Sequence, residues 1–486
     1  MSALPDTFLA SARRPAGPAN DSLGSHQALY RALYADNRGA GLHARSRAWL
    51  DQRLDEARQQ PCTLPESPDD LLQWMLDSSA DASQRYQDYL AERKAGAPRR
   101  FFRNRSHALA FLRGVAPTKL VDGSWLHGVL KHWANPRYAD LVRTYVEELG
   151  DGRADRNHVL LYRQLLAHHG IEASPADLAD DRYTQGAIQL ALARHTEDLL
   201  PEVIGFNLGY EQLPLHLPIT AYELNELGID PYYFTLHVTV DNADTGHAHR
   251  AVAAVLDAMP RFGDATAFWR RVRDGFRLND LGAGTNDVIA GFDQQQEVER
   301  IFIRKSDAGR SAHADYCKVA GRSVNDWLAH PAGVPDFLRA LEGAGWIVRD
   351  AAPEKSRFWK LLEGDHAEMF GVFSAYELQA IQDWLRGAAS SDGAAVPDAT
   401  TGAGLQRPRS FRAQQRLAAA RMPVAGASAL TDSAQDPDVE ALEAQLAQAP
   451  DVGALADLLV HAMSPSRHWM PAGLLATRRF VQLSLA

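Results

Sequence analysis

The chain has 486 residues, of which 45% are hydrophobic and 23% charged, and its formal net charge is -10. This composition predicts a globular protein, and the negative charge argues against a general binder of nucleic acids or anionic membranes. Its two cysteines, Cys62 and Cys317, are too few for a disulfide framework. The sequence has no apolar stretch of signal-peptide or membrane-spanning length, so we expect a cytoplasmic protein with a small-molecule partner.

Helical periodicity dominates the first three quarters of the sequence. Residues 1–25, rich in Ser, Pro, Gly and Ala, predict a flexible arm. Apolar residues at three- and four-residue spacings predict an N-terminal helical extension over 26–104. Residues 105–350 contain several long helical patterns and few strand-like alternations, which predicts an all-α catalytic domain.

The remainder of the chain changes in composition twice. Residues 351–387 predict a helical segment packed on the catalytic domain. Residues 388–437 are rich in Ala, Ser, Gly, Asp and Pro, which is typical of a disordered linker. Residues 438–486 predict short amphipathic helices that either fold back or meet a partner, so a homodimer stays an open alternative.

Common nucleotide and hydrolase motifs are missing from the sequence. There is no H-E-x-x-H and no phosphate-binding P-loop, and Gly282 with Gly284 gives only half of a G-x-G-x-x-G fingerprint. Neither serine within a Gly-Arg-Ser stretch completes a nucleophile elbow. The sequence therefore gives no support for a nucleotide site or for serine hydrolysis.

The most informative stretch follows Asp230 and Pro231, a helix-start signal that predicts a helix carrying His237 and Asp241 on one face. The letters FTLHVTV would also suit a buried strand, and we predict the helix. An imidazole and a carboxylate facing an apolar interior are costly unless they are paired or bind a cation. His247 would lie about 80° further round a straight helix, so its participation requires a local opening.

Two other stretches supply further candidate ligands. Glu148 ends one helical pattern and His158 opens the next, so their side chains could converge across the break. Glu202 and Glu211 are nine residues apart and would occupy opposite faces of one helix. Glu211 shares its face with an apolar stripe and is the better candidate, whereas Glu202 is also explained as a helix N-terminal charge after Pro201.

The candidate ligands are three carboxylates and three imidazoles with no thiolate: Glu148, His158, Glu211, His237, Asp241 and His247. Such an oxygen and nitrogen set suits iron or manganese better than structural zinc. Three carboxylates against two divalent ions leave a residual charge of about +1. The sequence therefore predicts a buried metal centre with Glu202 and Asp244 as alternative or outer ligands.

At these residues the sequence resembles the haem-oxygenase-like di-iron oxidases and oxygenases, also described as iron-containing redox enzymes. The resemblance runs over roughly residues 105–350 and is carried by Glu148 in EELG, His158 in RNHVLLY, Glu211 in GYEQLP, and His237 with Asp241 in HVTVD. It implies a haem-oxygenase-like helical bundle with two irons, dioxygen as co-substrate and, for some members, an external electron donor. Relatives oxidise amino acids, amines or fatty acids by N-oxygenation, desaturation or C–C cleavage.

The sixth ligand position departs from the family pattern. A histidine is expected three residues after Asp241, where this chain has Asp244, and His247 follows one turn later. We therefore expect binding of the second iron to be conditional. Two other hypotheses stay open: a metal-free thiaminase-like enzyme, which needs a nucleophilic cysteine, and a non-catalytic helical binding protein.

Overall fold

Side-chain caps mark the starts of many helices. Asn157 accepts a hydrogen bond from the backbone N–H of Leu160, and Asp264 accepts one from Ala267. Ser374 opens a third helix with a capping box. Each cap satisfies a backbone donor that has no partner within its own helix.

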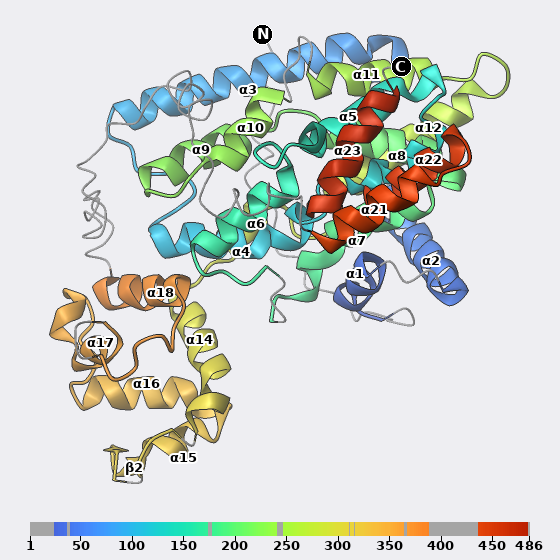
Figure 1. Cartoon of the computed structure of the whole chain (residues 1–486). Helices are drawn as coiled ribbons and strands as arrows, with labels where there is room; N and C mark the ends of the chain where they lie inside the picture. The colour runs from blue at the N-terminus through green and yellow to red at the C-terminus, as the bar shows by residue number, and fades with distance from the viewer. Residues whose placement is uncertain are drawn as a thin grey trace.

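The computed structural model describes residues 24–35, 39–173, 177–240, 246–310, 312–314, 316–363, 367–387 and 436–484. Most of the predicted arm at 1–25 and nearly all of the predicted linker at 388–437 lie outside these ranges. Within them nearly all regular secondary structure is helical (Figure 1), so the all-α prediction is confirmed. None of the described helices is long and apolar enough to cross a membrane.

The helices of the first part are α1 (His26–Tyr34), α2 (Ala40–Ala57), α3 (Leu71–Lys94), α4 (Arg105–Lys119), α5 (Ala139–Glu148), α6 (His158–His168) and α7 (Thr184–Arg194). They are followed by α8 (Thr196–Tyr210), α9 (His216–Glu226), α10 (Tyr232–Val240), α11 (His247–Ala258), α12 (Ala265–Arg277) and α13 (Thr285–Ala290). Short 3-10 turns connect several of them, among them η2 (Ser124–His132) and η4 (Gly150–Gly152). Two apolar clusters lie inside this helical bundle.

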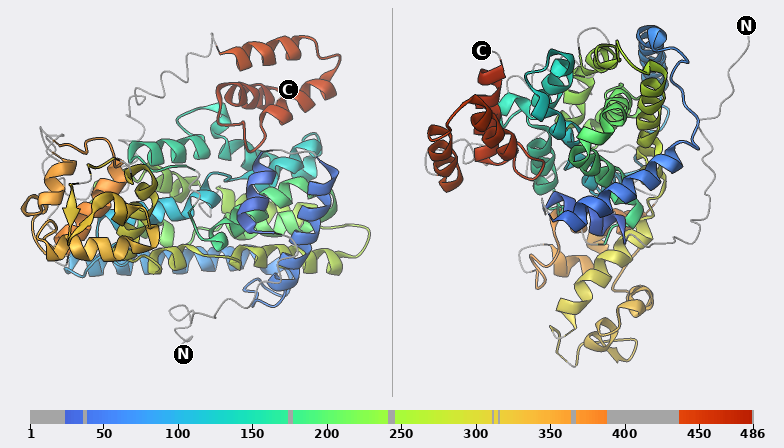
Figure 2. Two further views of the ribbon diagram at one scale, coloured as in Figure 1. Left: turned by 90° about the horizontal axis from the view of Figure 1, so that it is seen from below. Right: turned by 90° about the vertical axis from the view of Figure 1, so that its right-hand side faces the viewer.

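A smaller unit follows and has an apolar core of its own. It contains α14 (Gln294–Gly309), β1 (Lys318–Val319), β2 (Arg322–Ser323), α15 (Val324–Leu328), α16 (Val334–Gly343), α17 (Arg357–Leu362) and α18 (Ala375–Arg386). The two short strands pair antiparallel. The core of the unit extends from Val298 to Leu385, so the predicted domain boundary after residue 350 falls inside it. Figures 1 and 2 show this unit beside the main bundle.

The C-terminal helices α21 (Pro437–Ala447), α22 (Val452–Ala462) and α23 (Pro471–Ser484) fold back on the main bundle. They lie along the side that carries α5 (Figures 1 and 2). Leu459 and Phe480 belong to the same apolar cluster as Tyr145 of α5. These helices therefore fold back on the bundle, as one of the two sequence alternatives expects, and the alternative of a partner stays a prediction.

Candidate metal centre

Helix ends place the side chains that converge inside the main bundle. Glu148 is the last residue of α5, and His158 is the first residue of α6. Between them, Gly150, Asp151 and Gly152 all have positive φ, which turns the chain sharply. His247 likewise opens α11. Side chains carried by helices are held more precisely than side chains on loops, which favours a preorganised site.

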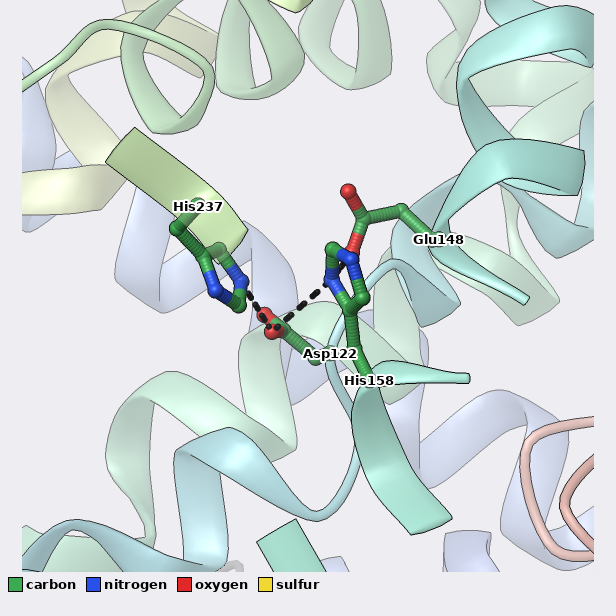
Figure 3. Close-up of side chains that lie close together, drawn as sticks. All are labelled: Asp122, Glu148, His158 and His237. Carbon is green, nitrogen blue, oxygen red and sulfur yellow. Dashed lines mark hydrogen bonds and ion pairs between the residues drawn. The ribbon is translucent and has the colours of Figure 1, made fainter. Parts of the chain in front are cut away.

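The first group of converging donors contains Asp122, Glu148, His158 and His237, all of them buried (Figure 3). His237 Nε2 lies 3.0 Å from Asp122 Oδ2, and His158 Nδ1 lies 2.6 Å from Glu148 Oε2. His158 Nδ1 is also 3.9 Å from Asp122 Oδ2. One donor atom from each residue lies within 4.8 Å of the other three, so the four could hold one ion.

A second group contains Glu148, Glu211 and His247, which are also buried. His247 Nδ1 lies 3.0 Å from Glu211 Oε2 and 3.2 Å from Glu148 Oε1. Its other ring nitrogen, Nε2, is 2.9 Å from Glu147 Oε2. Glu148 therefore faces both groups, with one carboxylate oxygen toward each.

The charge state of these carboxylates follows from their partners. Burial alone would raise the pKa of Asp122, but the Lys119 ammonium and the hydrogen bond with His237 bring it down to about 2. Burial is likewise outweighed at Glu148, where His158 and His247 hold the pKa well below its usual value. Both side chains are therefore anionic at neutral pH.

Two phenols orient Asp122. Tyr233 Oη donates to Asp122 Oδ2 at 2.6 Å, and Tyr210 Oη donates to Asp122 Oδ1 at 2.9 Å. Burial and the charge of Asp122 raise the pKa of both phenols well above 10, so they remain protonated donors. Lys119 Nζ donates to Tyr210 Oη at 3.2 Å, which completes a Lys–Tyr–Asp chain.

The ring nitrogens of His237 and His158 suit a bound cation better than they suit the carboxylates beside them. His237 Nδ1 lies 2.8 Å from the carbonyl oxygen of Tyr233 and must carry a proton to bond it, because a carbonyl only accepts. The hydrogen bond between Nε2 and Asp122 then needs a second proton on the ring, and a metal ion would take the place of that proton. His158 Nδ1 is buried and makes no hydrogen bond of good geometry despite its 2.6 Å contact with Glu148. A bound cation would reconcile both contacts.

The second group has the arrangement expected around a metal-binding histidine. Glu147 accepts from Nε2 of His247 and is itself held by Arg250 and Arg143. A carboxylate on the far nitrogen would fix the tautomer of a metal-bound ring, and a metal ion would then take the place of the proton in the hydrogen bond between Nδ1 and Glu211. The nitrogen and oxygen donors of the two groups, without a thiolate, suit iron or manganese.

Five of the six predicted ligands come together in these groups: Glu148, His158, Glu211, His237 and His247. The sixth, Asp241, and the alternative ligand Asp244 lie outside the described residues. Gly246 has an extended backbone immediately before α11 starts at His247, which is the local opening that the participation of His247 requires. The helix predicted after Asp230 is also present, and the strand alternative is wrong.

Glu202 does not join either group, so the prediction that it is an alternative ligand needs correction. Its buried carboxylate makes two 2.6 Å hydrogen bonds with Arg271 of α12. It lies on the face of α8 that packs against α12, where the guanidinium neutralises its charge. A carboxylate engaged in this way on both oxygens has little reason to bind an ion.

Asp122 is the residue that the sequence reasoning missed. It lies 26 residues before Glu148 in the turn between α4 and η2, outside the motifs that suggested the other ligands. The only local signal is the Gly that follows: Gly123 has φ of 76°, and a Cβ there would lie 2.8 Å from Cβ of Glu148. An Asp-Gly pair is common in turns, so this signal alone would not identify a ligand.

Residues 109–280, about a third of the chain, match the model of a family described as iron-containing redox enzyme. The match includes every residue of the two donor groups. No curated protein and no solved structure matches the chain. The part of the chain that carries the centre is thus similar to the iron-containing redox enzymes, and the predicted haem-oxygenase-like helical bundle is confirmed.

Proposed function

We propose that the protein is a non-haem di-iron oxidase or oxygenase that uses dioxygen to oxidise a small molecule such as an amino acid, an amine or a fatty acid. The family supplies the redox character and the iron. The observation that carries the step to two irons is the position of Glu148, whose two oxygens face two separate groups of buried donors.

In this proposal one iron is held by Asp122, Glu148, His158 and His237, and the other by Glu148, Glu211 and His247. Three carboxylates against two Fe²⁺ leave a charge of about +1, and Asp241 as a further ligand would bring it to about zero. Either total is small enough to bury. The two donor groups contain three carboxylates, the number that the sequence predicts, and Asp122 is one of them.

When bound, the iron pair would supply the electrons and the Lewis acidity for chemistry with dioxygen. The protein's own groups prepare the site for it. Tyr210 and Tyr233 fix the two oxygens of Asp122, and Glu147 fixes the ring of His247. Lys119 adds a positive charge beside the Tyr210 hydroxyl, where a proton could be held or passed on. The surrounding apolar clusters exclude water.

The competing hypotheses find less support. A thiaminase-like reaction needs a nucleophilic cysteine, but Cys62 and Cys317 are absent from both donor groups. A non-catalytic binding protein would have to keep three buried carboxylates among imidazoles without a cation, at a cost of several kcal/mol. The proposal names the substrate only by its chemical class and includes an external electron donor without specifying it.

The test is an anaerobic Fe²⁺ titration of the metal-free protein, followed by exposure to dioxygen with visible absorbance and oxygen consumption recorded. We expect two Fe²⁺ per chain, the second binding more weakly, and oxygen consumption only by the loaded protein. His237→Ala should lose the first site and His247→Ala the second. Buried His169 is outside both groups, so His169→Ala should bind like the wild type.

Trace iron binding by the wild type would refute the proposal. A stoichiometry of one that His247→Ala leaves unchanged would reduce the centre to a single ion. Two bound irons without any reaction with dioxygen would exclude the oxygenase and leave only metal binding.

A further inference from the structure

The loop that joins Glu148 to His158 is covered by the C-terminal helices. Arg478 Nη1 of α23 donates to the carbonyl oxygen of Gly152 at 2.6 Å. Gly152 has φ of 76°, and a Cβ there would lie 2.4 Å from the carbonyl oxygen of Leu474, so the loop and α23 touch backbone to backbone. Tyr145 Oη, one turn before Glu148, donates to the carbonyl oxygen of Met463 at 2.7 Å.

Asn157 connects this contact to the donor groups. Its Oδ1 accepts from Leu160 N–H and caps α6, while its Nδ2 donates to the carbonyl oxygen of Leu149. One side chain therefore bridges the residue after Glu148 and the helix that His158 opens. The same Nδ2 donates to Nδ1 of His468, at 3.1 Å.

His468 lies in the turn between α22 and α23 and is 1% exposed. Because an amide N–H₂ only donates, Nδ1 of His468 must be the acceptor, which fixes the ring as neutral. Burial agrees with this state, since it lowers the pKa of His468 to about 3. The neighbouring Trp469 ring lies 3.8 Å from the guanidinium of Arg163 on α6, which holds the turn against the helix.

We propose that the C-terminal unit, residues 436–484, sets the metal affinity of the centre by holding the loop between Glu148 and His158, with Asn157 and His468 as positioning residues. The segment that matches the iron-containing family ends at residue 280, so this unit is a feature of the chain outside that match. The inference rests on the proposed function in one respect, namely that the donor groups bind a metal.

The physical basis is preorganisation. Three consecutive residues with positive φ make the loop strained, and two of them are glycines that gain much freedom whenever the loop loosens. A loop that is free to relax would have to be ordered again on metal binding, and that cost would weaken binding. The outer partners of metal ligands commonly change metal affinity by about 10- to 100-fold.

The experiment is titration of the full-length, metal-free protein with Co²⁺ alone, a divalent probe whose visible absorption reports both occupancy and geometry. His468→Leu removes the ring acceptor for Asn157 and leaves the backbone acceptors in place, whereas His468→Gln can supply an amide oxygen for the ring nitrogen. Leu442→Ala is the matched control, because Leu442 docks the same unit from α21 within the apolar cluster. Thermal unfolding of the metal-free variants is measured in parallel.

We expect His468→Leu to raise the Kd for Co²⁺ about tenfold and to change the absorption spectrum, with substantial recovery in His468→Gln. Leu442→Ala should lower the Tm without changing Kd or spectrum. Wild-type Kd and spectrum in His468→Leu would overturn the positioning role alone. Equal weakening in Leu442→Ala and His468→Leu, in proportion to their loss of Tm, would also overturn it. Absence of Co²⁺ binding in the wild type would instead refute the metal centre itself.

Discussion

The metal centre and a second region around Glu223 bury the same kinds of side chain with different partners. Glu223 on α9 is 0% exposed and accepts from the hydroxyl of Tyr89 and from the backbone N–H groups of residues 100–102. Nearby, buried His107 accepts from the N–H of Arg103 through Nδ1 and bonds the carbonyl oxygen of Ile289 through Nε2. The hydrogen-bonding atoms of both side chains are therefore satisfied by backbone groups, together with the Tyr89 hydroxyl at Glu223.

At the metal centre the partners are other titratable side chains. Glu148 faces the rings of His158 and His247, and Asp122 faces His237. These contacts are favourable only if the rings are protonated or a cation lies among them. The contacts of Glu223 require neither a protonated ring nor a cation. Burial of a carboxylate is thus a poor sign of a metal site, and the chemistry of its partners is the informative observation.

The largest expected effect separates the two regions directly. Glu148→Gln removes the charge that both donor groups share and replaces one of the two ligand oxygens by an NH₂ group, so we expect loss of both irons and a Kd at least about 100-fold higher. Iron stoichiometry after anaerobic loading measures this. Retention of two tightly bound irons in this variant would show that Glu148 is not a metal ligand and, like Glu223, has only a structural role.

Glu223→Gln should have the opposite profile. Its amide N–H₂ would be placed against backbone N–H donors, so we expect the free energy of unfolding to fall by about 2–3 kcal/mol. Iron stoichiometry should stay at the wild-type value. Chemical denaturation with iron analysis checks both parts, and a loss of iron without a loss of stability would break the comparison.

The smallest expected effect concerns pH. Burial lowers the pKa of His107 from 6.5 to about 4, so below pH 6.5 the unfolded chain binds a proton that the folded chain does not. The folded state therefore loses stability as pH falls from about 6.5 to 4. For His107 we expect a loss of roughly 1–2 kcal/mol between pH 7 and pH 5.

Denaturant unfolding of the metal-free protein at the two pH values measures this effect. In His107→Gln the stability difference between pH 7 and pH 5 should shrink by that amount. An undiminished difference in this variant would mean that His107 is not the neutral, backbone-satisfied ring that its contacts indicate.

Sequence reasoning recovered the parts of the centre that obey local rules. Glu148 and His158 flank a glycine turn and an Asn cap, and His237 follows an Asp-Pro helix start, so the amino-acid pattern alone places each on its element. Asp122 could not be found in this way, because its closeness to His237 depends on how α4 and α10 pack. The partner of Glu202 could not be found in this way either, since Arg271 is 69 residues away in sequence.

Distant packing also determines which helices share one apolar core. The unit from Val298 to Leu385 has a separate apolar core, but its helical periodicity resembles that of the bundle before it. Periodicity reveals that a helix has an apolar face without revealing which other helix covers it. The contact of His468 with Asn157 is likewise beyond any local pattern, because the two are 311 positions apart in the sequence.

Glu148 has one further consequence, because it belongs to both donor groups. If both groups bind iron as proposed, an ion at the Oε2 side would withdraw charge from the same carboxylate that Oε1 offers to the second group, and it would fix the orientation of that oxygen. The two binding events would then be linked, and thermodynamics requires the coupling to be reciprocal. Electrostatic repulsion would oppose joint occupancy and the ordering of Glu148 would favour it, so the balance between them would determine how much half-loaded protein accumulates as iron becomes scarce.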